Sequence, residues 1–271
     1  MIVKEEKIKP LLRWAGGKLW MIDRIRDFIP TNIRKYHEPF IGGASVFLNL
    51  QTNAQCHISD TNAELICFYD QVKTNMKSLI TEVKKFKNSE KEYYNIRSSK
   101  PITNLGKAAR FYFLNRTCFN GLYRVNQAGF YNVPYGYRDI SLIDVDGFSL
   151  LHEKLQNTSI SCCDFETAFE KIENGDFAFL DPPYTVAHNK NGFIEYNQKI
   201  FSWEDQERLA GRIKLIMKKN AKFIMTNAYH DSIRKLYKGI GKQFEIERYS
   251  TISGVMNSRF KISELIITNC T

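Results

Sequence analysis

No stretch of the sequence is apolar over the length that a membrane-spanning helix needs. Residues 1–9 alternate in charge instead of building the apolar core of a signal peptide. Internal repeats and low-complexity linkers are absent as well. These absences predict a soluble, cytoplasmic protein that has no membrane as a partner.

Cysteine and histidine occur without the spacing of a metal site. None of the six cysteines belongs to a C-x-x-C pair, and the five histidines stand at no metal-ligand spacing. Cys162 and Cys163 are adjacent, which is a poor geometry for a structural disulfide. We therefore expect reduced thiols and no metal.

Two common phosphate-binding motifs are also missing. GxGxxG does not occur, and Gly16-Gly17-Lys18 fails the pattern GxxxxGK[ST] because Leu19 follows the lysine. Lys18 then has two interpretations. It is either a solvated surface lysine or a cation that pairs with a ligand carboxylate, such as that of a methionine moiety.

What the sequence does have is an uneven excess of positive charge. The chain of 271 residues is 43% hydrophobic and 25% charged, which suits a compact α/β domain, and its net charge is +10. Residues 71–140 carry thirteen Lys or Arg and four acids, a net charge of +9. Aromatic and amide side chains are interleaved there, as in Phe111, Asn115 and Asn120. A solvated helix face is one explanation, but the mixture favours a nucleic-acid partner.

Apolar periodicity and turn residues predict alternating strands and helices. Asn62 is placed to cap a helix. The expected elements are a helix over 19–28, an extended segment 36–40 that enters the turn 41–44, a helix from 45, a strand 56–59 ending at Asp60, a helix through 65–72, mostly helix over 76–115, a β-hairpin over 119–137 with its turn near 127–129, strands 159–163 and 177–180, a helix 203–217, a strand 222–226, and an antiparallel pair 244–250 and 263–268.

The segment Asp181-Pro182-Pro183-Tyr184 directly follows the strand 177–180. That strand reads FAFL without alternation, which is typical of a strand covered on both faces. Ligands of open α/β sheets bind at the carboxyl ends of strands. The segment is therefore either an ordinary Asp-Pro turn or part of a ligand site.

The chemistry of this segment favours a site for an exocyclic amine. Two prolines fix the backbone and remove two N–H donors, so the Asp181 carboxylate and the Pro182 carbonyl offer two acceptors. Accepting both hydrogens of an adenine amine favours a more localised lone pair, which can attack a sulfonium methyl in line. The Tyr184 ring can stack on a base turned out of its helix.

A glycine turn and an acid form a second candidate site. Gly42 and Gly43 allow a close backbone approach to a ligand at a strand end. Asp60 follows Gly42 by 18 residues, at the end of the next strand, where an acid can bind a ribose diol.

Together these motifs resemble the Dam-type DNA adenine-N6 methyltransferases, the alpha-group family with DPPY. The segments WAGGK, EPFIGGAS, ISDTN, LNRTCFNGLYRVNQAGFYNVPYG and FLDPPY occur in that family's order, and the likeness spans nearly the whole chain. The resemblance implies S-adenosylmethionine as the methyl donor. It also implies a set of donor-binding residues, in which the last is shared with the target amine: Trp14, Lys18, Phe40, Gly42, Asp60, Asp164 and Asp181.

The same resemblance implies double-stranded DNA as the partner and an adenine within GATC as the target. Arg124 would read a guanine through O6 and N7, and Phe119 stands where the family has an aromatic side chain that wedges into the duplex. Within the hairpin segment 116–137, the implied DNA-binding residues are Arg116, Phe119, Asn120, Leu122, Arg124 and Pro134. This sequence departs from the family pattern at Ala44, where glycine is commoner, and at Thr117 and Cys118.

We therefore expect an α/β fold with a Rossmann-like methyltransferase sheet and an inserted helical, basic DNA-recognition lobe with a β-hairpin. Residues 1–70 and 145–271 would form the donor-binding catalytic domain, and residues 71–144 the lobe, with its hairpin at 118–137. We expect a monomer.

Two other functions compete with this one. The first is a methyltransferase for an exocyclic amine in RNA, which Arg124 disfavours because A-form RNA does not offer its major groove for reading. The second is a catalytically silent DNA-binding relative, which the intact Asp181 and Tyr184 disfavour.

Overall fold

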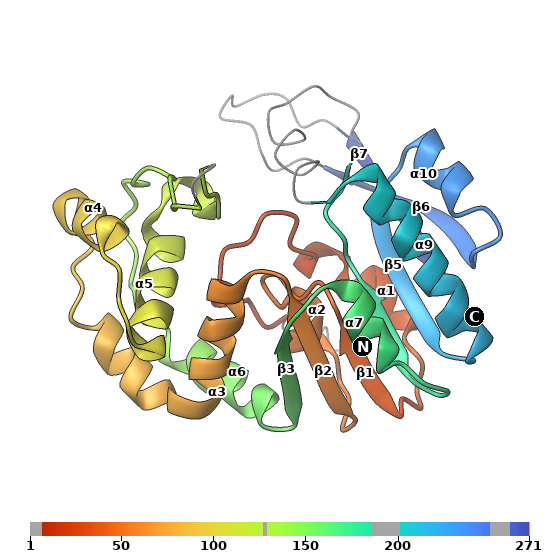
Figure 1. The fold of residues 1–271 in the computed structure, drawn as a ribbon, viewed down its shortest axis with the longest axis horizontal. Helices are drawn as coiled ribbons and strands as arrows, with labels where there is room; N and C mark the ends of the chain where they lie inside the picture. Colours follow the sequence, from red (N-terminus) through yellow and green to blue (C-terminus); the bar gives the residue numbers. More distant parts are fainter. Residues whose placement is uncertain (1–6, 127–128, 186–200, 250–260, 271) are drawn as a thin grey trace, which may run out of the picture. The chain divides into compact units, whose positions relative to one another are not determined.

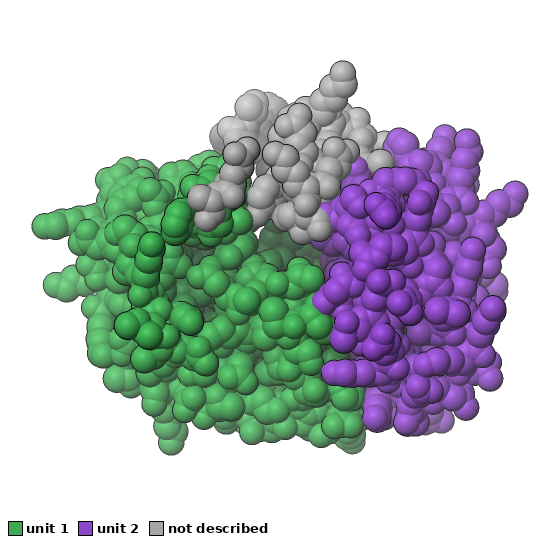
Figure 2. All heavy atoms as spheres, viewed as in Figure 1, with its two compact units in different colours: residues 1–24, 41–163 green, residues 25–40, 164–271 purple. Residues whose placement is uncertain are grey.

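The computed structural model describes residues 7–126, 129–185, 201–249 and 261–270. The chain forms two compact units, which Figure 2 shows in different colours. Unit 1 contains residues 1–24 and 41–163, and unit 2 contains residues 25–40 and 164–271.

Unit 1 combines a parallel strand pair with several helices (Figure 1). Its two strands pair in register from Cys56 opposite Thr158 to Asp60 opposite Cys162. The long helix α3 packs against α5, α6 and β3, and the Asn62 side chain caps it by accepting from two backbone amides, as expected. The elements of this unit are η1 (Leu19–Met21), α2 (Ser45–Asn49), β2 (Gln55–Asp60), α3 (Ala63–Val83), α4 (Glu90–Ser98), α5 (Asn104–Thr117), η3 (Phe119–Gly121), α6 (Val145–Gln156) and β3 (Thr158–Cys162).

Unit 2 contains a mixed sheet in the order β1-β4-β5-β7-β6. The first three strands are parallel, and β7 and β6 run antiparallel. All four residues of β4 are buried, as the FAFL pattern predicts. The elements are η2 (Arg26–Phe28), β1 (Lys35–Glu38), α7 (Phe165–Glu170), β4 (Phe177–Leu180), α9 (Trp203–Lys218), β5 (Lys222–Ala228), α10 (Asp231–Leu236), β6 (Lys242–Tyr249) and β7 (Lys261–Thr268), with α1 (Ile22–Ile25) spanning the boundary between the units.

This α/β arrangement is the Rossmann-like fold expected from the sequence. The strands expected around residues 36–40, 56–59, 159–163, 177–180 and 222–226 all occur, and so does the final antiparallel pair. Among the described residues, no helix is both long and apolar enough to cross a membrane.

Two segments differ from the elements expected for them. Residues 19–28 form two 3₁₀ turns around one short α-helical turn, and no side chain caps the first of them at Lys18. The two helices expected around residues 65–72 and from residue 76 onward are joined in α3, with non-helical backbone angles at Asn75 (φ −137°). The expected domain boundary after residue 70 falls inside this helix.

Candidate functional site

In unit 1, the glycine turn after β1 lies directly against Trp14. Gly42 has φ of +44°, a conformation that favours glycine. A Cβ atom on Gly42 would lie 2.8 Å from Cδ1 and Nε1 of Trp14, and one on Gly43 would lie 2.8 Å from the Trp14 Cβ. The indole in turn stacks on Tyr123, with 5.9 Å between ring centroids. The two glycines therefore make room for the tryptophan.

Ala44 shows why glycine is common at the end of this turn. It adopts the left-handed conformation (φ 61°, ψ 28°) and immediately precedes α2. This conformation costs an L-residue about 1–2 kcal/mol relative to the right-handed one. The departure from the family pattern therefore leaves the backbone path intact but carries strain.

Asp60 lies at the end of β2, as expected, and it also contacts the glycine turn. Its Oδ2 accepts from the Gly42 amide at 3.2 Å, and its Oδ1 accepts from the Asn62 amide at 3.0 Å. Burial raises the pKa of Asp60, and amide donation from Asn62, Gly42 and Thr61 opposes that rise. The turn is also held by Tyr69 of α3, whose hydroxyl donates to the Gly42 carbonyl at 2.6 Å.

Lys18 is buried, so its interpretation as a solvated surface lysine is wrong. Only 4% of the residue is exposed, and its ammonium donates to the Gly16 carbonyl at 2.6 Å. Because burying an ammonium group is costly, its position calls for compensating acceptors or a bound anion.

The hairpin segment of unit 1 alternates between buried and exposed residues along its second arm. Tyr131, Val133 and Tyr135 are buried in the core of this part of unit 1, together with residues of α4 and α5. Isolated bridges pair Val125 with Tyr131 and Cys118 with Tyr135. The hairpin is therefore present, but as single bridges instead of regular strands, and residues 127–128 of its expected turn lie outside the described residues.

Four of the expected DNA-reading side chains lie on the exposed side of this segment: Phe119, Asn120, Arg124 and Pro134. Phe119 is 51% exposed, which is unusual for a large apolar ring. The Arg124 guanidinium donates through Nε to Asn132 Oδ1 at 2.9 Å. That bond orients the two terminal nitrogens of the guanidinium.

The remaining expected DNA contacts are less accessible. Leu122 is half-buried and packs against the aromatic core of the hairpin. Arg116 is half-buried too, and donates to the Leu11 carbonyl at 3.2 Å. Thr117 and Cys118, which depart from the family pattern, are both buried, so their variation leaves the exposed face unchanged.

The basic residues of segment 71–140 divide into two groups. Nine are exposed: Lys77, Lys84, Lys85, Lys87, Lys91, Lys100, Lys107, Arg124 and Arg138. Four are half-buried and donate to backbone carbonyls, so they help to hold the fold together: Lys73, Arg97, Arg110 and Arg116. Only the nine exposed residues therefore contribute to a charged surface.

In unit 2, the Asp181 segment is anchored from two neighbouring strands. The Thr226 hydroxyl of β5 donates to Asp181 Oδ1 at 2.6 Å, and the Tyr184 hydroxyl donates to Glu264 Oε2 on β7 at 2.9 Å. Burial and the nearby carboxylates of Glu264 and Asp181 raise the pKa of Tyr184 well above its usual value, so this phenol stays protonated and remains a donor. Pro182 is buried.

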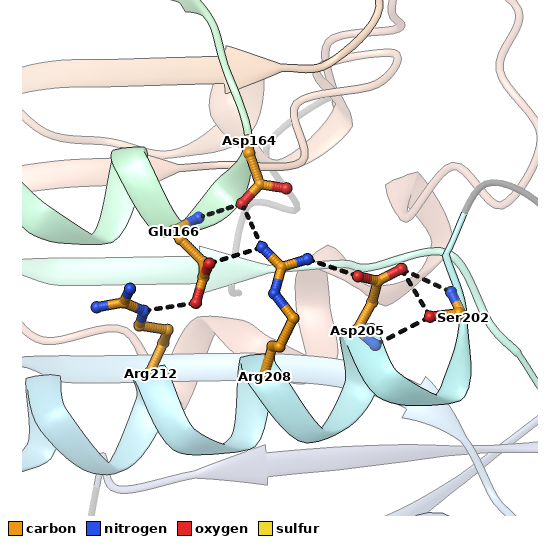
Figure 3. Close-up of polar contacts among 6 residues, drawn as sticks. All are labelled: Asp164, Glu166, Ser202, Asp205, Arg208 and Arg212. Atoms are coloured by element: carbon orange, nitrogen blue, oxygen red, sulfur yellow. Dashed lines mark hydrogen bonds and ion pairs between the residues drawn. The ribbon is translucent and has the colours of Figure 1, made fainter.

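Asp164 lies in an ion-pair network, which Figure 3 shows in detail. Its Oδ1 caps α7 by accepting from the Glu166 amide at 2.9 Å and also accepts from Arg208 at 3.1 Å. Arg208 further pairs with Glu166 and Asp205, and its guanidinium lies 5.0 Å from the ring centroid of Phe165. Hydrogen bonds from Arg208 and Arg212 lower the pKa of Glu166.

Phe40, the remaining expected donor contact of unit 2, lies beside this network. Its ring is 5.6 Å from that of Phe165 and 5.7 Å from that of Phe201. Within the described residues, no cluster of His, Cys, Asp or Glu has the make-up of a metal site.

The family model of the D12 class N6 adenine-specific DNA methyltransferases matches residues 14–253. The chain belongs to this family. It is 34% identical to the type II methyltransferase M.MjaIII of Methanocaldococcus jannaschii over 97% of this chain and 99% of that protein. It is also 34% identical to the type II methyltransferase M1.LlaDCHI of Lactococcus lactis subsp. cremoris, over 97% and 95%. The DNA adenine methylase of Haemophilus influenzae is 32% identical, over 96% and 93%.

As a member of the D12 class, this chain is an adenine-specific DNA methyltransferase, which confirms the resemblance drawn from the sequence. Its motif residues fall into two groups, one in each unit. Trp14, Gly42 and Asp60 are brought together in unit 1, while Asp181 and Tyr184 are tied to one sheet in unit 2.

Sequence reasoning missed four residues that hold these groups in place: Tyr69, Asn132, Thr226 and Glu264. A tyrosine on the buried stripe of α3 was the one available signal, because a buried hydroxyl needs a partner. The other three reach their partners because strands or hairpin arms pair, and the sequence around each residue does not show that pairing.

Proposed function

We propose that this D12-class enzyme transfers a methyl group from S-adenosylmethionine to N6 of an adenine turned out of duplex DNA. The observation that carries the proposal is the anchored Asp181 carboxylate at the end of β4, followed by the buried Pro182. S-adenosylmethionine would supply a methyl group on a positively charged sulfur. The N6 nitrogen would bond to that methyl carbon as the carbon–sulfur bond breaks and its electron pair stays on sulfur. One amine proton would then pass to solvent.

The geometry around Asp181 supports the role that we propose for it. Its Oδ1 is engaged by Thr226, which fixes the rotation of the carboxylate and directs the other oxygen. That oxygen and the Pro182 carbonyl would accept the two amine hydrogens. The Tyr184 ring, held through its hydroxyl, would stack on the extruded adenine. In this proposal, catalysis rests mainly on such positioning and electrostatic stabilisation.

The residues proposed for the donor match its chemical groups. Asp60, oriented by two amides, suits the ribose diol. The buried Lys18 ammonium suits the methionine carboxylate. The Trp14 and Phe40 rings and the Asp164 carboxylate suit the remaining surface of the donor, and Gly42 would contribute its backbone, because Trp14 fills the space beside its Cα atom.

The first experiment tests Asp181. We expect Asp181→Ala and Asp181→Asn to lose methyl transfer by at least about 100-fold, because one lacks the acceptors and the other replaces one acceptor with a donor. The assay is transfer of a labelled methyl group to a short duplex. Asp231→Asn is the matched control, since that acid is on α10 with its side chain 84% exposed. Activity of Asp181→Asn within tenfold of the parent would refute the mechanism.

We further propose that the lobe 71–144 binds the duplex and that its hairpin reads GATC. The carrying observation is the exposed guanidinium of Arg124, oriented by Asn132. Arg124→Ala should cost about 1–3 kcal/mol of binding on GATC and relax the preference at a single base pair. Lys84→Ala, which removes one exposed charge from the same lobe, should weaken all duplexes alike.

The measurement is a competition among duplexes in which each base pair of GATC is replaced in turn, at one salt concentration. An RNA hairpin of the same sequence tests the competing substrate class. If Arg124→Ala weakens every duplex by one common factor, the arginine contacts phosphate and the GATC assignment loses its main support. Sedimentation of the enzyme with and without a duplex tests whether it acts as a monomer, as we propose.

A further inference from the structure

The topology of unit 2 places two polar side chains beside the Asp181 segment, on strands that the catalytic motif does not include. In the register of β4 and β5, Leu180 lies opposite Met225, so the next residue of each strand, Asp181 and Thr226, are neighbours at the strand end. Thr226 is completely buried, and its hydroxyl lies 2.6 Å from Asp181 Oδ1.

The second side chain comes from β7. Glu264 lies opposite Ala228 of β5, and cross-strand partners point to the same face of a sheet. Residues two apart on one strand also share a face, so Thr226 and Glu264 are diagonal neighbours on a common face. Glu264 is 4% exposed and accepts from the Tyr184 hydroxyl at 2.9 Å.

The hydrogen-bond chemistry of these four groups gives each bond a direction. A hydroxyl carries one proton, and an ionised carboxylate only accepts. Thr226 therefore donates to Asp181, and Tyr184 donates to Glu264. Hydrogen bonds to a carboxylate are stronger than those between neutral groups, so each fixes the rotation of its partner more firmly.

Resting on the proposed function, we propose that Thr226 and Glu264 are positioning residues for methyl transfer. Thr226 fixes the carboxylate plane of Asp181, so that one oxygen remains directed at the target amine. Glu264 fixes the ring of Tyr184 through its hydroxyl, so that the ring forms a rigid platform for the extruded base. In this proposal neither side chain contacts the reacting atoms. Glu264 acts through Tyr184, whereas Thr226 acts mainly through Asp181 and is also a hydrogen-bond partner of Tyr184.

A positioning role and a purely structural role predict different kinetics. Loss of a structural contact lowers stability and leaves the turnover of the folded enzyme unchanged. Loss of a positioning contact lowers kcat, because misplacing a reacting group by about 1 Å can cost about 100-fold in rate. The KM for DNA and the dissociation constant of the donor should then change much less than kcat.

The test of Thr226 uses an isosteric pair. Thr226→Val keeps the shape and removes the donor, while Thr226→Ser keeps the donor. We expect kcat of the full-length enzyme to fall about 10- to 100-fold in Thr226→Val, with KM for a GATC duplex within about threefold, and to recover to within about threefold in Thr226→Ser. Parental kcat in Thr226→Val, or an equal loss in both variants, would overturn the assignment.

The test of Glu264 is a double-variant cycle with its partner. Glu264→Met removes the acceptor at similar volume, and Tyr184→Phe removes the donor while keeping the ring. If Glu264 acts through the Tyr184 hydroxyl, each single variant lowers kcat and the double variant is no slower than the slower single one. Losses that multiply in the double variant, or a parental kcat in Glu264→Met, would contradict the proposal. Fluorescence of 2-aminopurine at the target position reports base extrusion in the same variants.

Thermal unfolding of each variant separates folding from turnover, and kcat is normalised to the fraction that binds donor. The Asp181→Ala variant distinguishes a failure of the proposed function from a failure of the positioning assignment alone. If it stays active, the proposed function fails. If it is inactive while Thr226→Val and Glu264→Met keep the parental kcat, only the positioning assignment fails.

Discussion

The contact between the glycine turn and Trp14 gives a prediction about stability whose size follows from the structure. Replacing Gly42 with alanine adds a Cβ atom 2.8 Å from two atoms of the indole, a separation too short for two carbon or nitrogen atoms. The residue also has φ of +44°, which alanine adopts only under strain. Gly42→Ala therefore has to displace Trp14 or distort the turn.

Two penalties act together in this variant. A left-handed conformation costs an alanine about 1–2 kcal/mol, and overpacking of a well-filled region costs about 1–3 kcal/mol. The lower backbone entropy of alanine in the unfolded chain offsets about 0.5–1 kcal/mol. We expect the free energy of unfolding to fall by about 2–4 kcal/mol.

Ala44→Gly is the matched control, because it makes the opposite exchange two residues further along the same turn. Ala44 has φ of 61°, so glycine relieves the left-handed strain and costs only backbone entropy. We expect a change between zero and about 1 kcal/mol in favour of the folded state.

Urea unfolding followed by circular dichroism measures both free energies. Titration calorimetry with S-adenosylmethionine measures whether the displaced turn also weakens donor binding, as the contact between Gly42 and Asp60 leads us to expect. If Gly42→Ala unfolds within about 0.5 kcal/mol of the parent, the reasoning from close packing is wrong. If the two variants shift stability in the same direction, the assignment of backbone strain is wrong as well.

Three further predictions concern the hairpin, the charged surface and the core. Asn132→Ala removes the acceptor that orients the Arg124 side chain. In a competition assay it should reduce discrimination by about 1 kcal/mol at the same base pair as Arg124→Ala. An equal loss of affinity on all duplexes would contradict this prediction. Nine of the thirteen cations of segment 71–140 are exposed. A plot of the logarithm of the DNA-binding constant against the logarithm of the salt concentration should therefore have a slope of magnitude about 3–6. A slope near zero would mean that this segment is only a solvated surface. Asp176 is fully buried, ion-paired with Arg34 and hydrogen-bonded to His37. Asp176→Ala should therefore lower the free energy of unfolding by about 3–5 kcal/mol, and a loss below about 1 kcal/mol would contradict this prediction.

The fold could be predicted from the sequence largely because its buried strands have simple patterns. The FAFL run predicted β4, and the strand pattern predicted that the glycine turn and Asp60 would each follow a strand. Both are local features, since a parallel strand covered on both faces is continuously apolar and the turn and acid follow consecutive strands.

What escaped prediction depends on pairing between distant segments. Thr226 and Glu264 reach the Asp181 segment because of the register among β4, β5 and β7, and register is a property of strand pairs that no single segment displays. Lys18 was ambiguous because its burial depends on how its loop packs. The left-handed conformation of Ala44 could not be predicted, because an alanine in the sequence does not indicate a positive φ angle.

The alternation of the hairpin separates the residues that hold it in place from those that we propose to read DNA. Tyr131, Val133 and Tyr135 point into the core, and the Val133 carbonyl accepts from Tyr93 and Arg97 of α4. These inward contacts set the register, and a slip of one residue would bury the outward side chains instead. Because the buried side chains set the register, the exposed side chains can be replaced without a shift of the hairpin backbone. If the hairpin reads DNA as proposed, exposed substitutions should alter its base preference at little cost in stability, whereas buried substitutions should destabilise its fold.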